Sequence, residues 1–249
     1  MAICSACDQK LFLESEVDIE DGSAVSSEEI PDDVELICHC HFHWQCLMDE
    51  ASSVVQSLKC PSCDVHVGAA GSGATASSSS STPEIYVEYL NEGGLQSNLP
   101  LWASLNEEAY VQEHPEALPA RAFSVMCAEG DIDGLIELLI HADSEVADIG
   151  SIVRYQDPLS NMTSGLHLAV EGGHEGAIWL LLWLSSTLTE HQFPSQVHDT
   201  ASAMGLGRLP TTVEQDVRRL RNTSGQTAAM LALDLGQLSK VLDITLLEA

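Results

Sequence analysis

The chain has 249 residues, and its 38 acidic residues against nine Lys and Arg give a formal net charge of −29. Clustered Lys and Arg are what bind phosphate backbones and anionic lipid surfaces, so this charge excludes a nucleic-acid-binding or membrane-surface protein. The longest uninterrupted apolar run, Ala177–Leu184, is much shorter than the roughly 20 residues of a transmembrane helix. The length suits one large or two small domains.

Seven of the eight cysteines lie in residues 1–67. The first two, Cys4 and Cys7, stand where an export signal would have a basic stretch followed by an apolar run. We therefore expect an intracellular protein, with the cytoplasm as the default compartment and the nucleus left open. In that setting the cysteines stay reduced and bind metal rather than form disulfides.

The spacing of these cysteines and of one histidine is typical of a metal-binding domain. Two Cys-x2-Cys pairs flank a dense cluster, which gives eight candidate ligands: Cys4, Cys7, Cys38, Cys40, His43, Cys46, Cys60 and Cys63. A structural zinc site takes four such ligands in a tetrahedron, so eight ligands predict two structural zinc ions. Neither ion keeps a position for water, which excludes zinc hydrolase chemistry. The segment has few apolar residues, so we expect it to fold only when it binds metal.

The stretch Cys38–Cys46, with Phe42 just before the histidine, resembles the central signature of the RING domain, as does Pro61 inside the last pair. In that family the ligand pairs interleave. The resemblance implies one zinc on Cys4, Cys7, His43 and Cys46, and a second zinc on Cys38, Cys40, Cys60 and Cys63. The PHD finger is a weaker match, because it has a longer gap before its histidine.

One ligand of the second zinc has alternatives. Two-histidine RING domains have a histidine where Cys40 stands, and His39 and His41 flank it here. Cys40 keeps the one-residue gap after Cys38 and the two-residue gap before His43. We therefore favour Cys40, with His39 or His41 left open.

Three segments around this domain have other expected roles. The loop from Glu14 to Glu35 is so acidic and Ser-rich that we expect a solvated insertion. Residues 68–82 contain only small residues and predict a flexible linker. Residues 83–119 carry acidic and apolar residues but no basic one, and we expect a connecting or capping segment. Within it we expect a short strand or turn and then a helix near Ser104–Gln112, which would cover the next domain.

Residues 120–249 show helical periodicity and internal similarity. The stretch Thr163–Ala169, followed by Gly173 and His174, resembles an ankyrin repeat, and similar copies follow Ala122 and Gly225. The resemblance implies about three ankyrin-like repeats. Their landmark glycines are spaced more widely than the family period of about 33 residues, so long insertions separate the repeats. The second insertion covers about residues 185–218, and we expect a short helix over 212–220 at its end.

Several notable side chains of this region are expected to be structural. Cys127 lies on the apolar face of its predicted helix, and core packing is the expected role. His167 and His174 stand at ankyrin signature positions, where an imidazole ties helix to loop. Trp179 and Trp183 are four residues apart on one helical face, so we expect them to pack in the core.

The sequence thus predicts a small zinc-stabilised α+β RING-like domain followed by an all-α ankyrin-type helical repeat domain. This combination resembles that of ubiquitin ligases, in which the repeats hold a protein target and the RING recruits a charged ubiquitin-conjugating enzyme. No covalent intermediate and no catalytic residue is implied, because a RING acts by positioning the thioester. The expected recruiting surface consists of Leu36, Ile37, Leu47 and Pro61. The chain departs from the family pattern at three positions of that surface, namely Ala6, Glu50 and Asp64. A non-catalytic protein–protein interaction adaptor with a structural zinc domain therefore stays as the alternative.

Overall fold

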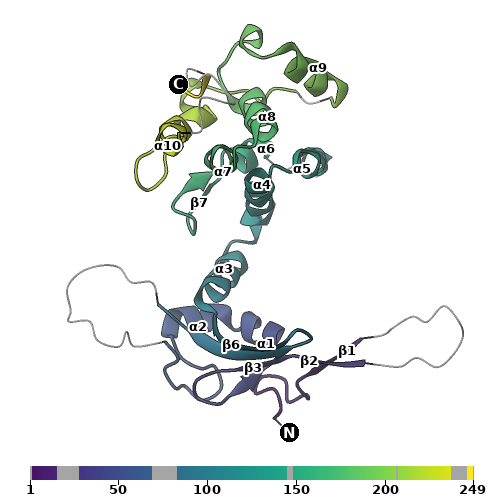
Figure 1. Cartoon of the computed structure of the whole chain (residues 1–249), viewed down its shortest axis with the longest axis vertical. Coiled ribbons are helices and arrows are strands. Elements are labelled where there is room, and N and C mark those ends of the chain that lie inside the picture. The colour runs from purple at the N-terminus through teal and green to yellow at the C-terminus, as the bar shows by residue number, and fades with distance from the viewer. Residues whose placement is uncertain are drawn as a thin grey trace, which may run out of the picture. The chain divides into compact units, whose positions relative to one another are not determined.

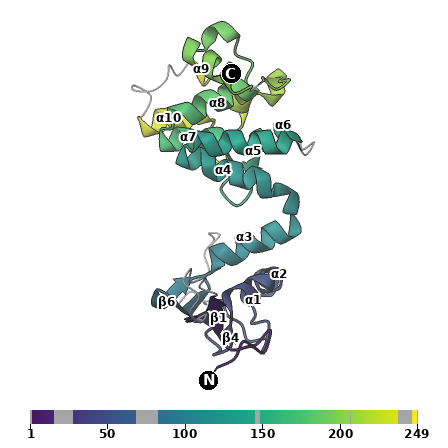
Figure 2. The ribbon, with the colours of Figure 1, turned by 90° about the vertical axis from the view of Figure 1, so that its right-hand side faces the viewer.

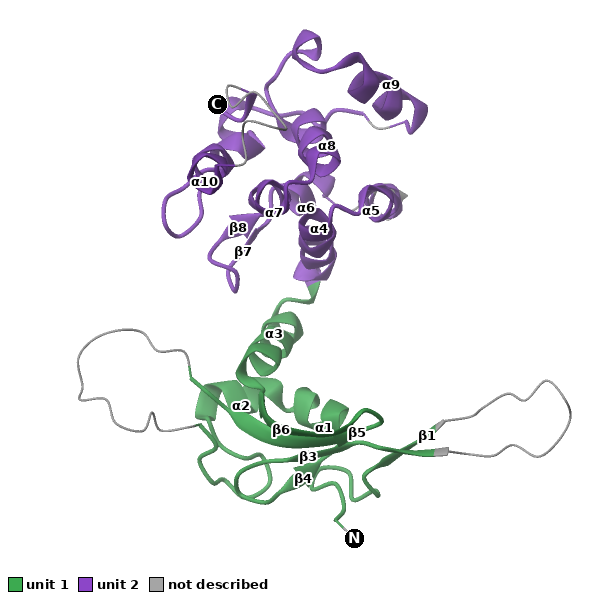
Figure 3. Ribbon diagram, viewed as in Figure 1, with its two compact units in different colours: residues 1–115 green, residues 116–249 purple. Residues whose placement is uncertain are grey.

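The computed structural model describes residues 2–15, 28–68, 83–144, 148–205, 207–236 and 246–248. The chain forms two compact units, residues 1–115 and residues 116–249 (Figure 3). The predicted linker over 68–82 and the middle of the predicted acidic insertion lie outside the described residues, except for Gly68. None of the helices in the described part of the chain is long and apolar enough to cross a membrane.

The first unit is a small antiparallel α+β structure (Figure 1). A two-stranded sheet pairs β1 with β2, and a four-stranded sheet has the order β4-β3-β5-β6. The strands are β1 (Phe12–Ser15), β2 (Glu28–Pro31), β3 (Asp33–Glu35), β4 (His41–Phe42), β5 (Tyr86–Asn91) and β6 (Gly94–Pro100). The helices are α1 (Trp44–Asp49), α2 (Ala51–Ser57) and α3 (Trp102–Glu113).

Residues after the predicted linker complete the core of this unit. Strand β5 pairs with β3, so that Val34 lies opposite Tyr89, and α3 packs on α1 and α2. Ile85 and Val87 alternate toward the interior, and Leu101 and Leu105 join them in the same cluster of buried residues. The segment delimited from the sequence as 83–119 therefore supplies two strands and a helix to the first unit. The expected helix near 104–112 is present as α3.

The acidic stretch before β4 differs from the sequence prediction. Residues 28–35 form β2 and β3 rather than a solvated loop. Asp32 between them is only 4% exposed, because its carboxylate accepts hydrogen bonds from the chain around it. The high charge of this stretch obscured two strands in the sequence: β2 pairs with β1, and β3 pairs with both β4 and β5.

The second unit consists of helices and one short hairpin (Figure 2). Its elements are α4 (Leu118–Glu129), α5 (Ile132–Ser144), α6 (Ile149–Val153), β7 (Gln156–Asp157), β8 (Thr163–Ser164), α7 (Gly165–Gly172), α8 (Glu175–Ser185), α9 (Ser195–Ala203) and α10 (Ala228–Leu235). Helix α7 packs against α4 and against α10, and α8 packs on α7. These helices enclose one hydrophobic core.

Tight glycine turns join the helices of two antiparallel pairs. Gly130 ends α4 before α5, and Gly173 ends α7 before α8, both with φ near +70°. A left-handed residue without a Cβ is the usual way to end a helix and reverse the chain. Gly236 ends α10 in the same way. The second helix expected after it, with Leu238, falls largely on residues 237–245, outside the described residues.

The second insertion is more structured than expected. It carries α9, which no sequence pattern predicted, and it replaces the expected helix over 212–220 with two 3₁₀ turns, Val213–Gln215 and Val217–Arg219. Asp216 separates the turns with an extended backbone, and its buried carboxylate accepts bonds from Thr187 and Arg218. These bonds hold Asp216 out of helical geometry.

Candidate metal centres

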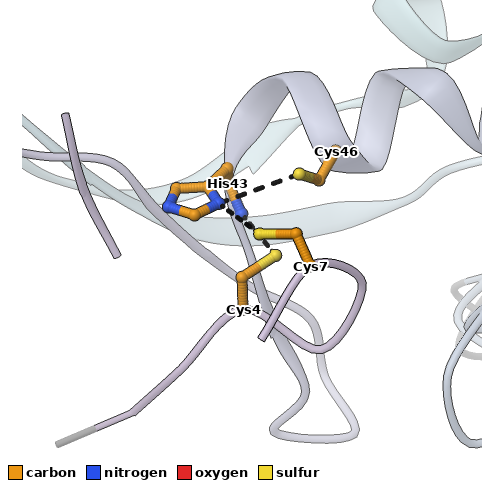
Figure 4. Close-up of side chains that lie close together, drawn as sticks. All are labelled: Cys4, Cys7, His43 and Cys46. Atoms are coloured by element: carbon orange, nitrogen blue, oxygen red, sulfur yellow. Dashed lines mark hydrogen bonds between the residues drawn. The ribbon is translucent and has the colours of Figure 1, made fainter. Parts of the chain in front are cut away.

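Four predicted ligands come together in the first unit beside α1. The ligand atoms of Cys4, Cys7, His43 and Cys46 all lie within 4.8 Å of one another. His43 Nδ1 is 3.3 Å from Cys7 Sγ and 3.7 Å from Cys46 Sγ (Figure 4). Ligands at the usual Zn–N and Zn–S distances on a tetrahedron are about 3.5 Å apart, so one zinc ion fits between these atoms.

The hydrogen bond made by Nε2 of His43 leaves Nδ1 as the ring atom that can bind a metal. His43 Nε2 donates a hydrogen bond to the Lys10 carbonyl oxygen at 2.8 Å. A carbonyl oxygen only accepts, so Nε2 carries the proton and Nδ1 keeps its lone pair for a metal. The His43 backbone N–H also donates to Cys4 Sγ at 3.4 Å. These two hydrogen bonds orient His43 even without an ion.

Local structure explains why these residues meet. His43 is the residue before α1 and Cys46 lies in its first turn, so a spacing of three places both on one side of the helix. Asp32 accepts hydrogen bonds from the Trp44 N–H on both carboxylate oxygens, each at 3.2 Å, and from the Tyr89 hydroxyl at 3.1 Å. Asp32 and Tyr89 therefore tie the start of the ligand-bearing helix to β5. Neither was identified from the sequence, because one acid among many in this stretch carries no distinguishing signal.

The second predicted set also comes together. The sulfur atoms of Cys38, Cys40, Cys60 and Cys63 lie within 4.8 Å of one another. The alternative ligands lie elsewhere: His39 Nδ1 is 2.6 Å from Glu35 Oε1, and His41 Nδ1 is 2.8 Å from Asp33 Oδ1. Of the three residues considered for this position, Cys40 is the one whose ligand atom faces the other three sulfurs.

The two Cys-x2-Cys pairs have the same backbone structure. In each, the backbone carbonyl oxygen of the first cysteine accepts a hydrogen bond from the N–H of the residue four positions later, Asp8 or Asp64, and both aspartates have φ near +60°. Each pair is also closed by an isolated antiparallel bridge, Ile3 with Lys10 and Lys59 with His66. Such a turn aims two sulfurs and several backbone N–H groups at one point.

The pKa values of the clustered thiols indicate that a bound cation would be stabilised in each cluster. Burial and the neighbouring thiols raise the pKa of Cys40 and of Cys46 to about 12. For Cys4, burial acts in the same direction but backbone N–H groups, chiefly that of His43, lower its pKa to about 6. Four clustered sulfurs cannot all ionise unless a metal compensates their charge, and a coordinating thiol is then fully deprotonated.

The two clusters could each hold a metal ion, with a Cys3His and a Cys4 donor set that suit zinc. With four protein ligands each, such centres are closed and structural, with no position left for a substrate or a water. The sets draw on alternate parts of the chain, because residues 38 and 40 of the second cluster lie between residues 7 and 43 of the first.

The expected recruiting surface needs a correction. Leu36 and Leu47 are 2% and 0% exposed and belong to the core of the first unit, so they cannot contact a partner. Leu36 is the residue directly after β3, and Leu47 lies on the buried side of α1. Ile37 is 56% exposed and Pro61 is half-buried. Half of the predicted apolar patch is therefore interior.

The notable histidines and cysteine of the second unit have structural roles, as expected. His174 Nε2 bonds to the Ala128 carbonyl at 2.9 Å, which joins α7–α8 to α4. His167 is fully buried, with Nδ1 2.8 Å from Ser164 Oγ and Nε2 bonded to the Gln226 carbonyl at 3.0 Å. Cys127 is buried, and burial raises the pKa of its thiol to about 12, so it is not reactive.

Comparison with known proteins gives no match to any family model, curated protein or solved structure.

Proposed function

We propose that the first unit is a RING-type zinc domain and that the chain is a ubiquitin ligase. The observation that carries this proposal is the interleaving of the two ligand sets. The first and third pairs, Cys4 with Cys7 and His43 with Cys46, converge on one point, while the second and fourth pairs converge on another. A RING domain holds its two zinc ions in this cross-braced order.

In this function the zinc centres shape a surface and take no part in bond making. The domain recruits a conjugating enzyme that carries ubiquitin as a thioester, and it accelerates transfer by holding that thioester in a reactive geometry. Ile37 precedes the ligand Cys38 and is exposed, and Pro61 lies inside the last ligand pair. These two side chains are the part of the expected recruiting surface that a partner can reach.

The second unit would hold the protein target as a stack of ankyrin-type repeats. Support comes from the two helix pairs, α4–α5 and α7–α8, each turned at a left-handed glycine, and from the packing of α7 between α4 and α10. The bonds of His174 to α4 and of His167 to the Gln226 carbonyl join neighbouring pairs. Such stacks bury a continuous core and leave one face for a partner.

The test is ubiquitin transfer in a reconstituted system with a panel of conjugating enzymes, ubiquitin and ATP. We expect chain formation with wild-type protein and its loss in Cys38→Ser. Ile37→Ala separates recruitment from folding, and it should reduce transfer while leaving both zinc ions bound. Ile140→Ala is the matched control, since Ile140 is 55% exposed in the second unit. Absence of transfer with every enzyme refutes the ligase.

A second candidate function is a non-catalytic adaptor that joins two protein partners. It is favoured by the burial of Leu36 and Leu47, together with the exposed Ala6, Glu50 and Asp64 around the zinc loops. These features leave a smaller and more acidic recruiting surface than a RING ligase uses. The adaptor is supported if zinc is bound, a target is captured and no enzyme of the panel transfers ubiquitin.

A further inference from the structure

The second unit contains an apolar cavity of about 200 Å³, partly open to solvent, between α5, α8 and α9. Its walls include Ile132 and Ile136 from α5, Trp179 and Trp183 from α8, and Val197 and Ala201 from α9. Although 38 of the 249 residues are acidic, no charged side chain lines this cavity in the described part of the chain. Helix α9, which belongs to the second insertion, packs on α8, and the uncharged cavity between α5, α8 and α9 is partly open to solvent.

One wall of the cavity is fixed by its surroundings. The Trp183 ring packs edge-on against Phe193, with centroids 5.3 Å apart. The Arg208 guanidinium lies 5.6 Å from the centroid of Trp183 and donates hydrogen bonds to the Trp183 and Ser186 carbonyl oxygens. Contacts of this kind hold an aromatic ring in place before a ligand arrives, which lowers the entropic cost of binding.

The size and chemistry of the cavity point to a ligand. Exposed apolar walls favour an apolar ligand, because covering them removes apolar surface from water. An apolar cavity of about 150 Å³ is already large enough to bind benzene. The present cavity is somewhat larger, so it has room for a fused two-ring molecule.

The rim of the cavity offers hydrogen bonds on one side. Gln196 and Thr200 line it, are four residues apart on α9 and are both exposed, so their amide and hydroxyl groups lie on the same face of the helix. A ligand that buries its rings between Trp179, Trp183 and Val197 could direct one polar group to this rim. A charged ligand would lose part of its hydration, and none of the described residues that line the cavity has a charged side chain to compensate it.

We propose that this cavity binds a small uncharged aromatic molecule of one or two rings with a single hydrogen-bonding group. The site would make the insertion a ligand-binding element of the second unit. It is independent of the zinc centres and of ubiquitin transfer, so it stands or falls separately from the proposed function.

The test is calorimetric titration of the full-length, zinc-loaded protein with indole as the probe. Ala201→Leu adds a side chain on the buried face of α9 that fills the cavity, and Ala203→Leu makes the same change at an exposed position of that helix. Should Ala201→Leu fail to fold, Val197→Phe on the same wall replaces it. Indole-3-carboxylate serves as the charged analogue.

We expect saturable binding of one indole to the wild type and to Ala203→Leu, and a loss of at least about tenfold in affinity in the filled variant (1.4 kcal/mol is tenfold). The carboxylate should bind at least about tenfold more weakly than indole. Absence of saturable indole binding to the wild type, unchanged binding to the filled variant, or equal binding of the carboxylate each overturns the proposal.

Discussion

Leu105 offers the sharpest test of whether α3 belongs to the metal-binding unit. Its side chain is fully buried and packs in the same cluster as Val34, Leu47 and Val54, which come from residues 1–67. Truncation of a buried Leu to Ala removes several methyl and methylene groups and leaves a cavity, at a cost of about 2–5 kcal/mol. We therefore expect Leu105→Ala to destabilise the first unit by about 3 kcal/mol.

That loss should also be measurable as zinc affinity. On the proposal that both clusters hold zinc, folding and zinc binding are coupled in a domain with so small a core. About 3 kcal/mol then corresponds to a loss of about a hundredfold in the combined affinity for the two ions. The assay is competition for zinc with a chromophoric chelator. Leu95→Ala is the matched control, since Leu95 lies on β6 of the same segment and is 64% exposed. Unchanged zinc affinity in Leu105→Ala would refute the reasoning and indicate that residues 1–67 fold alone.

The remaining predictions concern the second unit. Burial lowers the pKa of His167, so its neutral form is favoured in the folded state. The free energy of unfolding should therefore be highest above a pH of about 6.5 and should decrease as the pH falls below that value. Urea unfolding from pH 8 to pH 5 measures this. A Cβ on Gly165 would lie 2.9 Å from Cys127 Sγ, so Gly165→Ala should cost about 1–3 kcal/mol, and less in a Cys127→Ala background, in a double-mutant cycle. Arg218→Ala should cost about 3–5 kcal/mol in thermal unfolding, because it leaves the buried Asp216 carboxylate without its cation.

Each of these has a control within the chain. His198 is exposed, so His198→Gln should leave the pH dependence in place, whereas His167→Gln should weaken it. Additive costs of the Gly165 and Cys127 changes would contradict the close approach of α4 and α7. Arg219 follows Arg218 and is exposed, so Arg219→Ala should change the unfolding temperature little; an equal effect of both arginine changes would argue against the buried pair.

The metal clusters were predictable because ligand chemistry restricts both residue type and spacing. Two pairs of cysteines, each pair separated by two intervening residues, are rare by chance in an intracellular chain, and the interleaved pairing followed from the resemblance to a known arrangement. Gly130 and Gly173 were recognisable for a similar reason, since a sharp helical turn favours a residue without a Cβ.

What the sequence did not reveal depends on contacts distant along the chain. Asp32 is indistinguishable from neighbouring acids until Tyr89 and Trp44 surround it. The burial of Leu36 and Leu47 depends on β5, β6 and α3, which lie beyond the predicted linker and were assigned to a connecting segment. The helix α9 has few apolar residues and no repeat signature, and its position follows from packing on α8.

The alternation of ligands along the chain sets an order for biosynthesis. Cys4 and Cys7 emerge first from the ribosome, yet their centre is incomplete until His43 and Cys46 have followed, and the second centre waits for Cys63. The hydrophobic support for both arrives later still, with β5 and α3. A nascent chain therefore exposes half-formed thiol clusters for most of the synthesis of this unit. On the proposal that the clusters bind zinc, zinc supply and protection from oxidation at that stage should determine how much of the protein matures.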